Sequence, residues 1–90
     1  MTRILLVDNE ESYRLLIRTR LECHSGFEIA GEAGNGAQAV AMAAELKPDL
    51  ILMDISMPGM DGLKASRKIK DLHPDITVII LSALDLGDEV

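Results

Sequence analysis

Four short apolar blocks recur along the chain and are separated by longer, more polar stretches. The blocks span residues 3–7, 27–32, 49–53 and 76–81. Three of them are nearly continuous runs of Ile, Leu, Val and Met, a pattern typical of strands that are buried on both faces. The block at 27–32 alternates instead, which is typical of an edge strand. The pattern therefore predicts four strands, with the second one outermost.

Between the blocks, the apolar positions follow the period of a helix. Two stretches repeat an i, i+3, i+4 spacing, which predicts amphipathic helices. A third helix is predicted over residues 62–72, where Asp61 is suited to cap its start. Its Lys and Arg residues should form a solvated face. The residues that share the apolar faces of the first two helices are Tyr13, Leu16, Ile17 and Leu21, and Ala37, Val40, Ala41 and Ala44.

Strict alternation of strands and helices predicts a parallel sheet with right-handed crossovers. The expected fold class is therefore α/β, with helices on both faces of one sheet. In such sheets, ligands bind beyond the carboxyl ends of the strands. Asp8, Asp54 and Ser82 follow the first, third and fourth predicted strands, so function should be sought at these residues.

Composition excludes several other classes of protein. The chain has 90 residues and a formal net charge of -6, with 15 acidic and 9 basic side chains, so direct nucleic-acid binding is not expected. A single cysteine, Cys23, cannot form a disulfide framework, which favours a cytoplasmic setting. The apolar blocks are far shorter than the roughly 20 residues that a membrane helix needs, and we expect no membrane association.

Two carboxylates point to the chemistry of this chain. If the first and third strands are neighbours, Asp8 and Asp54 lie side by side. Like charges at that distance are stable only with a cation or a shared proton between them. Mg²⁺ prefers oxygen ligands and readily takes phosphate oxygens. The sequence therefore predicts Mg²⁺ as the cofactor and phosphoryl chemistry as the function.

The segments ILLVDNE, PDLILMD, MPGMDG and TVIILSA make the chain resemble the receiver domain of two-component response regulators. The resemblance covers the whole chain in order. It implies a flavodoxin-like, doubly wound parallel sheet with strand order 2-1-3-4-5, here with four strands and three helices of the usual five and five. Residues 72–82 resemble the LuxR or NarL group, in which a helix-turn-helix output domain follows the receiver.

The resemblance also implies roles for individual residues. Asp54 matches the phosphoacceptor, which takes a phosphoryl group from a sensor histidine kinase. Asp8, Asn9, Asp54 and the backbone carbonyl of Ser56 match the Mg²⁺ ligands. Ser82 matches the switch hydroxyl that bonds a phosphoryl oxygen. Such a domain is not a classical enzyme, because its chemistry is limited to its own phosphorylation and dephosphorylation.

The chain departs from the family pattern in two places. Asn9 offers a neutral amide oxygen where the family usually has a second acid, so metal affinity should fall. The chain also stops at Val90, before the fifth strand with its lysine and before the last two helices. We therefore expect residues 1–90 to form an incomplete receiver domain, whose DNA-binding output would lie elsewhere.

Alternatives remain open at this point. Asp8, Asn9 and Ser82 are also residue types that cap helices. The strand at 76–81 would present an open apolar edge and favour a homodimer. The chain could then be a phosphorylation-independent interaction domain. An aspartyl-phosphate hydrolase is disfavoured, because Ser56 stands where such an enzyme has its second acid.

Overall fold

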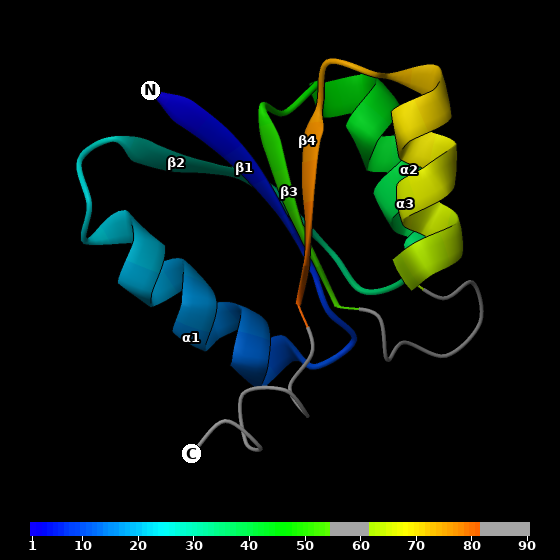
Figure 1. Ribbon diagram of the computed structural model, residues 1–90. Coiled ribbons are helices and arrows are strands. Elements are labelled where there is room, and N and C mark those ends of the chain that lie inside the picture. Colours follow the sequence, from blue (N-terminus) through cyan, green and yellow to red (C-terminus); the bar gives the residue numbers. More distant parts are fainter. Residues whose placement is uncertain (55–61, 82–90) are drawn as a thin grey trace.

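The computed structural model describes residues 1–54 and 62–81 and shows one parallel sheet with helices on both faces (Figure 1). The strand and helix bounds agree closely with the sequence pattern, and each predicted strand begins and ends within one residue of the observed one. The elements are β1 (Thr2–Val7), α1 (Glu11–Glu22), β2 (Phe27–Ala33), α2 (Gly36–Leu46), β3 (Leu50–Asp54), α3 (Gly62–Leu72) and β4 (Thr77–Leu81).

The strand order is β2-β1-β3-β4, and every neighbouring pair is parallel. This order confirms that β2 lies at an edge and that β1 and β3 are neighbours. Helix α1 covers one face of the sheet, whereas α2 and α3 cover the other (Figure 1). The chain thus has the flavodoxin-like, doubly wound arrangement that the sequence predicted, in an incomplete form.

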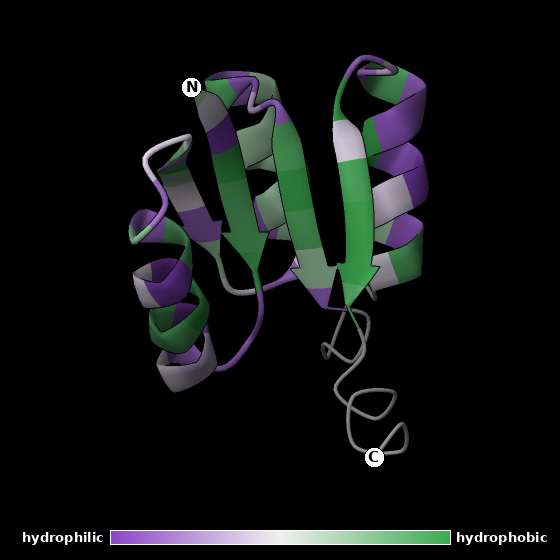
Figure 2. Cartoon of the chain, turned by 60° about the vertical axis from the view of Figure 1, so that its left-hand side comes forward, coloured by the Kyte–Doolittle hydropathy of each residue, from purple (hydrophilic) through white to green (hydrophobic). Residues whose placement is uncertain are grey.

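The main core lies between the sheet and the pair α2 and α3. Small side chains let these helices approach the strands closely, while larger ones fill the space between. Figure 2 shows apolar colour along β1, β3 and β4 and polar colour on the outer side of α3. The buried residues of this core include Leu5, Val7, Ile51 and Met53 from the strands and Ala39, Ala43, Ala65 and Ile69 from the helices.

The prediction that three strands are buried on both faces is right for β1 but wrong for β4. Residues Ile4 to Val7 of β1 are at most 2% exposed. In β4, however, Thr77 and Ile79 are exposed, and Ile79 retains 43% of its surface. The physical reason is position, because α1 packs against β1 and β2 and β4 pairs with β3 alone within the described part of the chain.

Strand β2 contains an irregularity that the alternating sequence pattern did not predict. Its register with β1 shifts between Ile4 and Leu5, so that Ile29 pairs with Ile4 but Gly31 pairs with Leu5. The extra residue, Ala30, reverses the alternation of faces. Glu32 therefore pairs with Leu6 and shares the α1 face of the sheet with Ile29.

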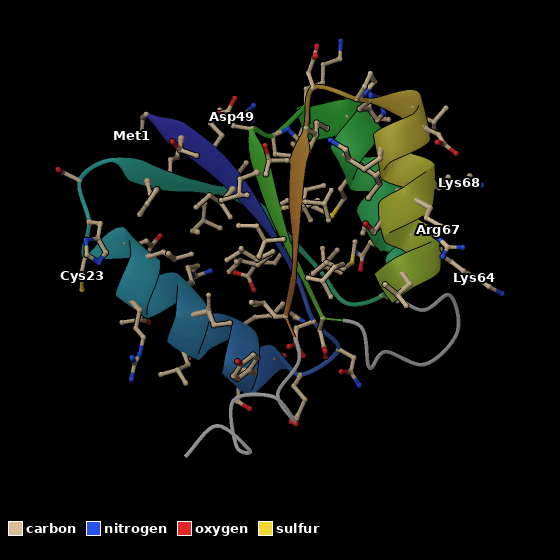
Figure 3. All side chains as sticks on the ribbon, viewed as in Figure 1. Met1, Cys23, Asp49, Lys64, Arg67 and Lys68 are labelled. Carbon is tan, nitrogen blue, oxygen red and sulfur yellow. The ribbon has the colours of Figure 1, made fainter. Side chains whose placement is uncertain are left out.

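Polar residues define the ends and outer face of the helices. The Asn35 side chain caps α2 by accepting a 2.8 Å hydrogen bond from the Gln38 N–H. Lys64, Arg67 and Lys68 are exposed and point outward from α3 (Figure 3), which confirms the solvated face. The predicted cap Asp61 lies outside the described residues. No helix in residues 1–54 or 62–81 has the length and apolar character needed to cross a membrane.

Two isoleucines test this account of the core. Ile51→Ala should lower the free energy of unfolding by about 2 to 5 kcal/mol, because it leaves a cavity in β3. The matched change Ile79→Ala, on the exposed face of β4, should cost far less. Urea unfolding followed by circular dichroism measures both, and equal losses would contradict the assigned core.

Candidate functional site

The candidate site lies at the carboxyl ends of β1 and β3. The register pairs Val7 with Met53, and each is followed directly by an aspartate. Adjacent strands lie about 4.8 Å apart, so Asp8 and Asp54 come from neighbouring positions at the same edge. The sequence predicted that the two carboxylates lie side by side if β1 and β3 are neighbours, and the two strands are neighbours in the sheet.

Asp8 is buried, with 7% of its surface exposed, and its backbone and side chain are both held. Its N–H donates to the Ala33 carbonyl at 3.0 Å, and its carbonyl accepts from Arg14 Nη1. Its Oδ1 accepts from the Glu10 N–H at 2.8 Å. The carboxylate therefore stabilises the turn that leads into α1, although the N-cap position itself is Glu10.

The electrostatic environment of Asp8 opposes its charge. Burial raises the pKa of the Asp8 carboxyl above its ordinary value of 3.8, and the backbone N–H of Glu10 opposes this effect. The negative charges of Asp54 and Glu10 raise the pKa further, whereas the Arg14 guanidinium lowers it, and the net direction is upward. A cation bound between Asp8 and Asp54 would relieve this repulsion.

The donor types at this edge suit a hard cation. Asp8 and Asp54 offer carboxylate oxygens, and Asn9 is an exposed neighbour with an amide oxygen. Oxygen donors of this kind match Mg²⁺, which also keeps several waters. Ser56 and Ser82 lie outside the described residues. Within the described ranges, no three His, Cys, Asp or Glu side chains form a metal-binding group.

A family model of the response regulator receiver domain matches residues 4–89 of the sequence. The chain belongs to this family. The receiver is 43% identical over 88 residues to the response regulator VraR of Staphylococcus aureus, covering 98% of this chain and 42% of VraR. It is 40% identical over 85 residues to GacA of Pseudomonas viridiflava, covering 94% of this chain and 40% of GacA. This receiver thus spans about two fifths of the length of these relatives.

Solved structures agree with the assignment of the fold. The response regulator domain of Thermotoga maritima CheB superposes with a TM-score of 0.89 at 36% identity, covering 93% of this receiver and 62% of that chain. A CheY from Borrelia burgdorferi, solved in a CheX-CheY-BeF3-Mg complex, gives a TM-score of 0.82 at 28% identity, covering 99% and 67%. The flavodoxin-like fold and its two-component class are therefore established for this receiver.

Two residues beside the site were missed from the sequence. Arg14 contacts the backbone of Asp8, and its Nε lies 3.0 Å from Glu32 Oε1. Burial raises the pKa of Glu32, but its hydrogen bonds and charge interactions with Arg14 and Arg18 bring it below the ordinary 4.5. A glycine inside a strand often marks a bulge, so Gly31 was the available signal that Glu32 could turn toward α1.

The pKa of Asp8 gives a pH-dependent prediction for the metal-free receiver. Because the Asp8 pKa is higher in the folded chain than its ordinary value of 3.8, the folded chain holds this proton more tightly than the unfolded chain does. The resulting contribution to stability is fully present below pH 3.8 and is lost as pH rises through the folded-state pKa. Asp8→Asn removes the buried charge and should raise the melting temperature at pH 7 more than at pH 3. Thermal unfolding in a chelating buffer measures this, and a uniform shift at both pH values would contradict the assignment.

Proposed function

We propose that this chain is the phosphoacceptor receiver of a two-component system and that Asp54 takes a phosphoryl group from a sensor histidine kinase. The observation that supports this most directly is the position of Asp54, the last residue of β3, beside the buried Asp8. Ligands of open α/β sheets bind outside the carboxyl ends of the strands, which is where Asp54 lies. Family membership makes phosphotransfer the expected use of this geometry.

In the proposed step, a carboxylate oxygen of Asp54 attacks the phosphorus of a phosphohistidine. A P–O bond forms, the P–N bond breaks, and the imidazole nitrogen keeps the electron pair and takes up a proton. Asp8, Asn9, Asp54 and the Ser56 carbonyl would hold Mg²⁺, which supplies positive charge against the phosphoryl oxygens. The similar Borrelia CheY was solved in a complex with BeF3 and Mg, which supports this choice of cation.

The proposed signal is a change in the segment that follows β4. The Ser82 hydroxyl would donate a hydrogen bond to a phosphoryl oxygen, and this contact would exist only in the phosphorylated state. Because the relatives VraR and GacA are more than twice as long as the matched region, we propose that an output domain, of the DNA-binding kind, receives the signal in the cytoplasm. The family match does not favour a phosphorylation-independent interaction domain as the primary role.

Phosphorylation by a small donor tests the proposed function. Acetyl phosphate with Mg²⁺ should add one phosphoryl group to the chain, detected by intact mass spectrometry. Asp54→Asn should abolish the adduct, and so should EDTA. Asp71→Asn, an exposed carboxylate on α3, is the matched control and should leave the yield unchanged. An adduct that survives Asp54→Asn, or a folded chain that takes no phosphoryl group, would contradict the proposal.

The neutral Asn9 gives a second test. Asn9→Asp restores an acid at the site and should strengthen Mg²⁺ binding by about tenfold, because ligand charge tunes affinity for hard cations. Asn35→Asp is the control, since it adds the same charge at the cap of α2 and should change affinity little. Calorimetric titration with MgCl2 measures both, and equal effects would mean that Asn9 is not a ligand position.

A further inference from the structure

We propose that Arg14 is a positioning residue for the metal site, and that Glu32 anchors it. This inference rests on the proposed function, in which Asp8 is a metal ligand. Arg14 lies in α1 and does not need to contact the ion. It acts through the backbone of Asp8, whose carboxylate direction it fixes.

Arg14 makes one contact with Asp8 and one with Glu32. Its Nη1 donates to the backbone carbonyl of Asp8, and its Nε donates to Glu32 Oε1 at 3.0 Å. The Arg14 side chain is only 17% exposed. A guanidinium is planar with fixed donor directions, so two contacts on different segments of the chain leave it little freedom to turn.

Glu32 is held by two arginines of α1. Its Oε1 accepts from Arg14, and its Oε2 accepts from Arg18 Nη1 at 2.6 Å. Both oxygens are therefore engaged by α1, and the side chain is 23% exposed. Glu32 faces α1 because of the extra residue Ala30 in β2, so this irregularity of the sheet is what makes the anchor possible.

The contact with Arg14 adds to the restraints on Asp8. With Arg14 in place, Asp8 is held at its N–H by Ala33, at its carbonyl by Arg14 and at its Oδ1 by the Glu10 N–H. Within the described residues, the assigned side-chain hydrogen bond of Asp8 is the one at Oδ1. Groups that orient a ligand in this way commonly change metal affinity by 10- to 100-fold when they are mutated.

The direction in which Mg²⁺ affinity changes on removal of Arg14 distinguishes a positioning role from a purely electrostatic one. Arg14 carries a positive charge close to Asp8 and lowers its pKa. If charge alone mattered, removal of this cation would strengthen Mg²⁺ binding. A positioning role predicts the opposite, because the loss of the carbonyl contact lets the peptide after Asp8 rotate.

The test compares Arg14→Gln with Arg18→Gln by calorimetric titration with MgCl2. Both variants lose one positive charge and one bond to Glu32, but only Arg14 contacts Asp8. Arg14→Gln should weaken Mg²⁺ binding by about tenfold, whereas Arg18→Gln should change it by less than about twofold. Unchanged or tighter binding in Arg14→Gln overturns the proposal. Arg14→Lys keeps the charge and one donor site, and should recover part of the affinity.

A second readout needs no metal. Exchange of the Glu10 amide proton, followed by NMR in EDTA, reports the hydrogen bond to Asp8 Oδ1. It should accelerate by about three- to tenfold in Arg14→Gln and stay unchanged in Arg18→Gln. If Arg14→Gln does not fold, Arg14→Lys decides by the same two readouts, and wild-type values in both overturn the proposal. If the unmodified chain binds no Mg²⁺, the metal site of the proposed function fails, while Glu10 exchange alone still decides the role of Arg14.

Discussion

The repulsion between two aspartates at neighbouring strand ends is the constraint on which the rest of this receiver depends. Parallel pairing of β1 with β3 brings Asp8 and Asp54 to one edge of the sheet, and burial of Asp8 denies its charge the relief of water. A fold that only needed stability would gain by replacing one of these carboxylates. Their presence together fits the cation and the phosphoryl transfer that we propose for this site.

The surrounding structure holds Asp8 in place at the end of β1. Strand β1 is buried on both faces, so the end of the strand that presents Asp8 is held by the core. Arg14, Glu32 and Arg18 then connect that end to α1 and β2 through three polar contacts. The two halves of the arrangement are complementary, because packing fixes the strand and the ionic network fixes the peptide that follows it. Rigidity at this point would matter for the proposed metal site, since a loosely held ligand would bind a cation weakly.

The fold was largely predictable because local and global patterns agree. Continuous apolar runs located the strands, and the edge position of β2 followed from its alternation. The exposure of one face of β4 was not predictable, since the exposure of Ile79 depends on where α1 packs and not on the sequence of β4 itself. The two aspartates were found from their positions after apolar strands. Arg14 was missed because its partners, Asp8 and Glu32, are brought to it by tertiary packing and by a bulge at Ala30, for which Gly31 was only an indirect signal. Ser56 and Ser82 remain predictions from the family pattern.

The central claim is that Asp8 and Asp54 share one ion, and a double-mutant cycle on Mg²⁺ binding tests it most directly. Calorimetry on the unmodified chain, Asp8→Asn, Asp54→Asn and the double variant gives the four affinities. Two ligands of one ion are coupled, so either single change should remove most of the binding and the second should add little. Independent, additive losses, or binding that survives both changes, would contradict the account.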